Sequence, residues 1–307
     1  MYIKEVSASE YKSCFIKYPH IYNTTEFSEL NRHKVENIRY LLFEDTKTRF
    51  GIILGETEKA FHSPFSAPFG SFTSNKRERL EYLNIAVTML KEYGNKNKKK
   101  IIITLPPTIY DSFQISRTVN IMSRMATLRH ADINYHFDLC NFNIYNKIAE
   151  RNARKNLNRA MREDLKFRHI AVHDKGGISK VYNIIRQNRE EHGYPLRMSL
   201  DDVMKTIEVI PADFFILEHK DTGVASAQVF QTTEDIFQVI YWGNSGIYSD
   251  MRPMNRLAYH IFEYYNKKGA RILDIGPSTE NGEPNYGLCD FKESIGCSAT
   301  PKFSFEL

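Results

Sequence analysis

Cysteine is scarce in this 307-residue chain. The four thiols, Cys14, Cys140, Cys289 and Cys297, include no Cys-x-x-Cys pair. Cys289 and Cys297 are too far apart for a zinc knuckle, and no second pair is present to complete a tetrahedral site. The spacing therefore argues against a metal site, and we expect reduced, incidental thiols.

Long apolar runs are also missing. No stretch approaches the roughly 18 uninterrupted apolar residues of a membrane helix, and the first 14 residues are too polar for a signal peptide. Hydrophobic residues at 42% and aromatics at 13% exclude a mostly disordered chain. A length near 300 favours two modest domains over one core. These features predict a cytoplasmic globular protein with no membrane insertion.

Basic residues are concentrated in one segment. Residues 142–168 hold eight basic and three acidic side chains, a surplus that equals the +5 net charge of the whole chain. At about 100° per residue, five bases fall on one helical face and four apolar residues on the other. The bases are Arg151, Lys155, Arg159, Arg162 and Lys166, and the apolar residues are Ala153, Leu157, Ala160 and Met161. The predicted helix presents either an ordinary solvated face or a docking strip for the phosphates of a nucleotide, a coenzyme or RNA.

The two halves of the chain repeat one order of elements. Each half has an apolar strand, a polar turn and a second strand, which predicts a hairpin. Each then has a helix opening with Arg-Leu-x-Tyr and a short apolar strand stopped by proline. The matched positions are Asp45 and Asp221 in the turns, Arg79 and Arg256 at the helix starts, and Pro106 and Pro277 after the strands. We therefore predict an α/β fold with mixed sheets, made of domains at residues 1–140 and 141–307, the second opening with the basic helix.

This order resembles the GNAT acyltransferase unit, and a tandem pair with a basic helix between the copies resembles the Fem-type aminoacyl transferases. Four short motifs, at residues 63–71, 151–160, 268–278 and 287–296, carry the resemblance. They are a strand end bearing proline and glycine, a basic opening of the second copy, a strand with Asp-x-Gly, and Phe-Lys followed by glycine. The resemblance implies two tandem GNAT-like acyl-CoA N-acyltransferase domains.

The activity that the resemblance implies is transfer of an acyl group from acyl-CoA, or of an aminoacyl group from aminoacyl-tRNA, to an amine. The implied partners are a small-molecule or bacterial cell-wall-precursor amine and, for the second donor, tRNA, with no metal. Such transfer depends mostly on holding two substrates together, with modest acid–base help and stabilisation of an oxyanion. Two alternatives stay open: a non-catalytic ligand-binding or scaffold protein on the same fold, and an RNA-binding module that uses the basic helix.

Two residues are the candidate catalytic groups. By its match to the Phe-Lys motif, Lys292 would place an ammonium near the donor carbonyl or phosphates; an exposed surface lysine is the alternative. Asp274, in Asp-Ile-Gly, is placed to orient or deprotonate an amine. A strand-end carboxylate bonded to backbone explains the same residue.

The candidate donor-binding residues are Tyr241, Trp242, Arg252, Asn255 and Phe291. Tyr241 and Trp242 belong to a strand that GNAT folds splay around the donor, although core packing also explains two aromatics there. GNAT enzymes mostly hold the pyrophosphate with a glycine-rich loop, whereas residues 248–255 contain no glycine. The side chain of Arg252 is therefore expected to replace backbone contacts to phosphate.

Acceptor or phosphate binding is assigned to Arg154, His192, Tyr194 and Arg197. His192 is suited to act as a base near neutral pH, and Arg197 to meet a carboxylate or phosphate. An ordinary helix end that stops at Gly193 is the alternative for this loop.

Overall fold

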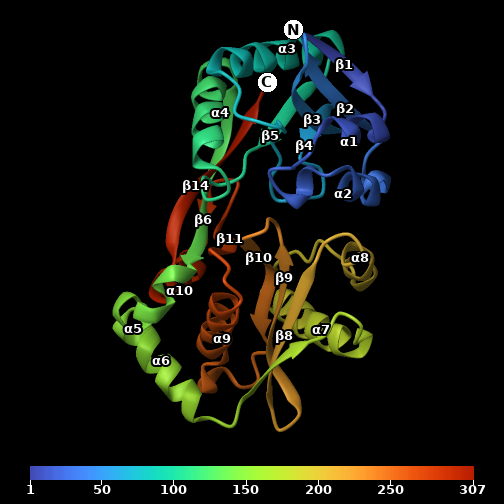
Figure 1. Ribbon diagram of the computed structural model, residues 1–307. Coiled ribbons are helices and arrows are strands. Elements are labelled where there is room, and N and C mark those ends of the chain that lie inside the picture. Colours follow the sequence, from blue (N-terminus) through green and yellow to red (C-terminus); the bar gives the residue numbers. More distant parts are fainter. The chain divides into compact units, whose positions relative to one another are not determined.

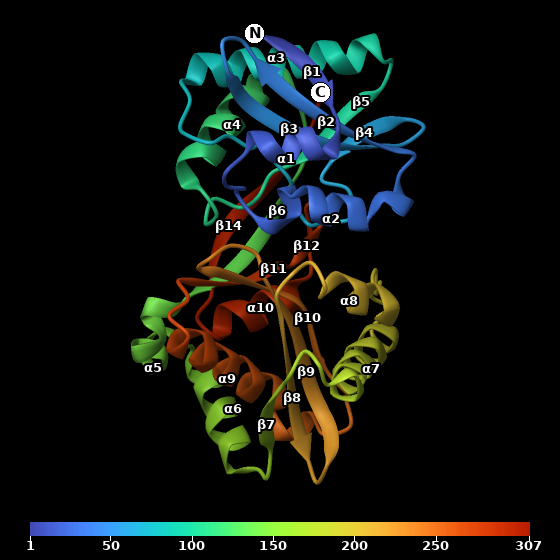
Figure 2. The ribbon, with the colours of Figure 1, turned by 45° about the vertical axis from the view of Figure 1, so that its right-hand side comes forward.

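The computed structural model describes residues 1–307 and divides the chain into two compact units. The first unit comprises Met1–Ile133, Thr279–Glu283 and Thr300–Leu307, and the second comprises Asn134–Ser278 and Pro284–Ala299. Figures 1 and 2 show that each unit contains sheet and helices. The α/β class predicted from the sequence is confirmed. None of the helices has both the length and the apolar character needed to span a membrane.

The first unit is a mixed sheet between two layers of helices. The strands, in sheet order, are β1 (Tyr2–Val6), β2 (Asn37–Glu44), β3 (Thr48–Glu56), β4 (Ala60–Ser63), β5 (Lys100–Thr104) and β14 (Ser298–Glu306). The helices are α1 (Ala8–Cys14), α2 (Thr25–Leu30), α3 (Leu80–Lys96) and α4 (Ser112–Met125). Side chains alternate along β2, so Leu41 and Phe43 pack with α3 and α4, while Tyr40 and Leu42 pack with α1.

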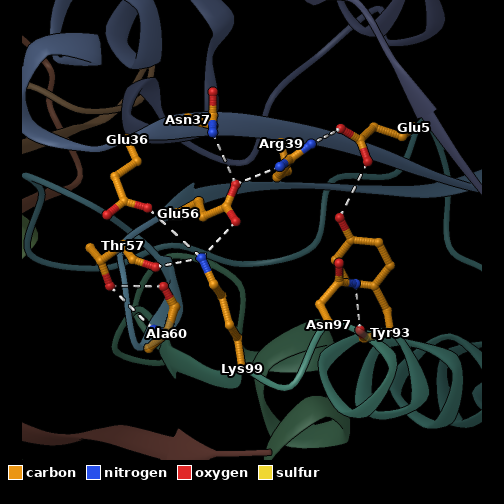
Figure 3. A network of polar contacts seen from close by, with 10 residues as sticks. All are labelled: Glu5, Glu36, Asn37, Arg39, Glu56, Thr57, Ala60, Tyr93, Asn97 and Lys99. Carbon is orange, nitrogen blue, oxygen red and sulfur yellow. Dashed lines mark hydrogen bonds and ion pairs between the residues drawn. The ribbon is translucent and has the colours of Figure 1, made fainter.

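A buried carboxylate ties this sheet together (Figure 3). Glu56, which is 7% exposed at the end of β3, accepts hydrogen bonds from Arg39 at 2.8 Å, Lys99 at 2.7 Å and Asn37 at 3.3 Å. Lys99 also donates to the carbonyl of Thr57. Burial alone would raise the pKa of Glu56, but the bonds from Lys99 and Arg39 outweigh it and leave the pKa lowered.

The second unit repeats the arrangement. In sheet order the strands are the second half of β6 (Thr127–Asp138), from Asn134 on, then β11 (Ile272–Pro277), β10 (Ile236–Asn244), β9 (Thr222–Gln231), β8 (Ala212–His219) and β7 (Lys166–Ile170). The helices are α5 (Tyr145–Ile148), α6 (Arg151–Arg162), α7 (Lys175–Glu191), α8 (Leu200–Thr206), α9 (Pro253–Lys267) and α10 (Tyr286–Ser294). Residues of α6 and α9 pack on one face of the sheet and residues of α7 and α8 on the other.

The duplication inferred from the sequence appears as two matching series of elements. The series from β1 through α1, α2, β2, β3, β4, α3, β5 and α4 to β6 recurs from β7 through α7, α8, β8, β9, β10, α9, β11 and α10 to β14. Both expected hairpins are present, β2–β3 and β8–β9. The last strands are exchanged, since β14 pairs with β5 and β6 pairs with β11. For this reason the units do not follow a single cut at residue 140.

The basic helix α6 is shorter than the sequence pattern predicted. It ends at Arg162, and Lys166 begins strand β7. The apolar face holds Ala153, Leu157 and Ala160 in the core, whereas Met161 is 38% exposed. Arg256 of α9 donates to the carbonyls of Ala160 and Glu163 and thereby caps the C-terminal end of α6.

Candidate functional site

Strands β10 and β11 of the second unit pair only at their starts. The parallel register covers Ile236 to Gln238 on β10 and ends at the partner of Gln238, Asp274. Beyond this point β10 continues to Asn244 with β9 alone, across a bulge between Val239 and Tyr241. The edge of β10 that faces β11 therefore carries backbone groups that no strand pairs.

Polar side chains meet where this pairing ends. Asp274 is fully buried and accepts hydrogen bonds from Gln238 at 2.7 Å, Asn134 at 2.8 Å and the amide of Gly276 at 2.9 Å. His136 of β6 lies directly opposite Asp274 in the sheet. A buried carboxylate needs such donors, since desolvating an unpaired charge is costly.

Lys292 of α10 is enclosed beside the same strand. The side chain is 2% exposed, so the alternative of a surface lysine is wrong. Its Nζ donates to three successive carbonyls, of Ile275 at 3.1 Å, Gly276 at 2.8 Å and Pro277 at 3.1 Å. Gly276 has a φ of +73°, a left-handed conformation that glycine adopts without strain. The ring of Tyr135 lies 5.4 Å from Nζ.

The enclosure changes the protonation of this lysine. Burial lowers the pKa of Lys292 to about 8, and the positive charge of Arg189 acts in the same direction. The charge of Asp274 opposes the shift. The ammonium is therefore partly deprotonated near pH 8, which is unusual for a lysine.

The candidate donor residues are only partly brought together. Trp242 and Phe291 form an edge-to-face pair with centroids 5.9 Å apart, on the side of the sheet that packs against α9. Tyr241 points to the opposite side, where it packs with the cluster of α7 and α8. Adjacent residues of a strand face opposite ways, so Tyr241 and Trp242 do not line one surface.

The start of α9 holds two further candidates. Arg252 is exposed, has a φ of +55° and precedes Pro253 at the first helical position. Asn255 is buried in the first turn. The arrangement leaves the first amides of α9 without a side-chain cap.

The polar loop after α7 presents three of the acceptor candidates. His192 and Tyr194 are exposed and stack with centroids 5.7 Å apart. The hydroxyl of Tyr194 accepts a 2.7 Å hydrogen bond from Asn285, the N-cap of α10. Arg197 is exposed on the same loop.

The fourth acceptor candidate, Arg154, belongs to α6. Together with other bases it lines an open groove of about 680 Å³. The lining residues are Arg151, Arg154, Lys155, Asn158, Arg159, Arg162 and Glu163. None of the five bases forms an ion pair, which leaves a continuous positive face.

Three polar residues of the site were not singled out by sequence reasoning. Gln238 interrupts an apolar strand, and that interruption was an available signal. Asn134 and His136 alternate on β6 with Tyr135 and Phe137, but β6 joins β11 only through a long-range pairing. No group of three histidine, cysteine, aspartate or glutamate side chains is placed to hold a metal ion.

These two duplicated units define a Fem/GNAT-like fold. The chain is similar to FemX, with a TM-score of 0.68 at 12% identity over 100% of this chain and 97% of that one. It is also similar to the C-terminal domain of a putative lysylphosphatidylglycerol synthetase from Agrobacterium fabrum, with a TM-score of 0.62 at 11% identity over 98% and 92%. A third similar structure is a tandem GNAT protein from the clavulanic acid biosynthesis pathway, with a TM-score of 0.55 at 8% identity over 99% of this chain and 97% of that one. No known family profile and no curated protein sequence matches the chain.

Proposed function

We propose that this protein is an N-acyltransferase or aminoacyltransferase that moves an acyl group from acyl-CoA or aminoacyl-tRNA to an amine. The reaction centre is the point in the second unit where β10 and β11 part. The observation that carries the proposal is the buried Lys292 ammonium beside this point, next to the fixed carboxylate of Asp274.

The chemistry follows from the residues. The unpaired edge of β10 offers backbone groups to an extended donor, and Trp242 and Phe291 supply an apolar wall. The positive charge of Lys292 stabilises the oxyanion that forms when an amine attacks the donor carbonyl. Because the three protons of Nζ bond carbonyls 275–277, Lys292 also fixes this segment, so its contribution includes positioning.

Asp274 acts through its neighbours. Its oxygens are occupied by Gln238, Asn134 and Gly276, so the carboxylate orients these groups and supports the lysine charge. Direct removal of a proton from the amine requires one of those bonds to open.

The basic face of α6 favours aminoacyl-tRNA as the donor. Successive turns of a helix are 5.4 Å apart, so Arg151, Lys155 and Arg159 form a regular row of charges without acidic partners. A polyphosphate backbone binds such a row by releasing counterions.

The test is a donor screen with matched variants. Purified protein is incubated with a mixture of amines and either labelled acyl-CoA or labelled aminoacyl-tRNA, and transfer of label to amine is measured. We expect transfer from one donor, and a loss of about 100-fold or more in Lys292→Met. Lys267→Met, at an exposed lysine of α9, is the control and should transfer normally. Folded protein that binds ligands but never transfers label supports the scaffold alternative instead.

A further inference from the structure

One arginine outside the proposed reaction centre is half-buried and has no acidic partner in the chain. Arg189 lies in the last turn of α7 and is half-buried. Its Nε is buried and has no hydrogen-bond partner, and its guanidinium forms no ion pair. A guanidinium removed from water normally meets a carboxylate or a phosphate, often through two parallel bonds.

Two aromatic rings frame this guanidinium. Its Cζ lies 5.3 Å from the ring centroid of Tyr241 on β10 and 5.7 Å from that of Tyr194. The backbone places Tyr194 there, because Gly193 at a φ of +67° ends the helix and the amide of Tyr194 bonds the carbonyl of Arg189 at 2.8 Å. The rings stabilise the cation but supply no acceptor for its donors.

The nearby acids are engaged elsewhere. Glu190 pairs with Arg186 at 3.8 Å, and Glu191 accepts a hydrogen bond from Gln187 at 2.8 Å. Burial lowers the pKa of Arg189, with no carboxylate among the groups that act on it. The charge is thus uncompensated by this chain.

Arg189 belongs to α7, which packs on the opposite face of the sheet from α9. Tyr241, which contacts Arg189, faces α7 and α8, whereas Trp242 faces α9 on the other side of the sheet. Tyr194, whose ring faces Arg189, nevertheless accepts a hydrogen bond from Asn285, the N-cap of the helix α10 that carries Lys292. A ligand group on Arg189 would therefore approach the reaction centre from the side opposite α9.

We infer that Arg189 binds an oxyanion, a phosphate or a carboxylate, of the amine acceptor, between the rings of Tyr194 and Tyr241. The ligand's identity as an acceptor rests on the proposed transferase function, whereas the anion site itself does not. The acceptor class is an amine that carries a phosphate or carboxylate group.

The anion site is tested by calorimetric titration at fixed ionic strength, with inorganic pyrophosphate and malonate as the probes for the two sources. We expect wild type to bind at least one of them, and the tighter probe identifies the source. Arg189→Met should weaken that binding by tenfold or more, and Arg189→Lys by less, because lysine keeps the charge but not the two parallel bonds. Lys180→Met, at an exposed base of the same helix that holds no acidic side chain in an ion pair, is the control and should bind as wild type does.

Circular dichroism establishes whether each variant is folded. If Arg189→Met does not fold, Arg189→Lys takes its place in the comparison with wild type. The inference is overturned if wild type binds neither probe, or if the folded Arg189 variants bind as tightly as wild type. Titration measures binding without turnover, so the two proposals can fail separately. If wild type transfers no acyl group but binds the probe, and Arg189→Met loses that binding, the transferase function is refuted and the anion site is supported. In an active enzyme, Arg189→Met should raise the acceptor KM and leave the donor KM unchanged.

Discussion

Gln238 donates a 2.7 Å hydrogen bond to Asp274 at the last paired position of the parallel strands β10 and β11. This side-chain bond joins the two strands at the last pair before they separate. Asn134 and the amide of Gly276 bond the other oxygen of the carboxylate. A complete set of donors holds Asp274 in one orientation in the core.

The first prediction concerns this bond. Asp274→Asn places an amide NH₂ against the NH₂ of Gln238, so two donors face each other. We expect a loss of stability of about 1–3 kcal/mol, measured by thermal unfolding. The double variant Gln238→Glu with Asp274→Asn restores a donor–acceptor pair and should recover at least half of the loss. Equal loss in the single and double variants would show that the Gln238 bond is not the cause.

The second prediction is a pH profile. With the pKa of Lys292 lowered to about 8, the ammonium is lost as pH rises through that value. If its charge stabilises the oxyanion, the transfer rate should fall above about pH 8. Lys292→Arg keeps its charge at higher pH, because guanidinium pKa values exceed 12. Any activity that this variant retains should show no such fall, and an identical fall in both proteins would assign the titration to another group.

The third prediction concerns Glu56 in the first unit. Glu56→Gln removes the negative charge that Arg39 and Lys99 share, and we expect a loss of about 2–3 kcal/mol in unfolding free energy. The folded-state pKa of Glu56 is lowered, so its stabilisation is present above the ordinary pKa and is lost as pH falls below about 4.5. The variant should lack this part of the acid destabilisation.

A matched control for Glu56 exists on the surface. Glu26 pairs with Lys12, and both side chains are largely exposed. Glu26→Gln should change stability by less than about 0.5 kcal/mol, because solvent screens an exposed pair. A comparable effect of the two substitutions would mean that burial does not strengthen the Glu56 network.

The fourth prediction concerns the basic face of α6. Replacing Arg151, Lys155 and Arg159 together by Gln should weaken tRNA binding and reduce the slope of log K against log salt by about 2–3. A triple Gln variant of Lys59, Lys96 and Lys98, exposed bases of the first unit, is the control and should keep the wild-type slope. Unchanged tRNA binding in the α6 variant would show that α6 is not the surface that binds tRNA.

Much of the fold was predictable because local patterns and topology agree. The hairpins β2–β3 and β8–β9 follow from apolar strands around polar turns, and the repeat in sequence matches the repeat in structure. The end of α6 was placed too late. Lys166 would lie on the same face as Arg162 if the helix continued, but α6 ends at Arg162 and Lys166 begins β7. Periodicity does not report where a helix stops.

The site was less predictable, since it depends on burial. The Phe-Lys motif singles out Lys292, but only the folded chain shows three carbonyls around its ammonium. Tyr241 and Trp242 are neighbours on one strand, and alternation of side chains is by itself enough to direct them to opposite faces. Arg189 carries no motif, and its lack of an acidic partner becomes visible only when α7, β10 and the following loop are assembled.

The exchange of β6 and β14 bears on how the protein is made. Strand β14 begins at Ser298, 194 positions after the end of its neighbour β5 at Thr104. During synthesis the core of the first unit therefore cannot be completed until Phe305, near the end of the chain, has been made. Until then an open sheet edge faces solvent or a chaperone, so the earliest-made half of this polypeptide is among the last parts to be completed.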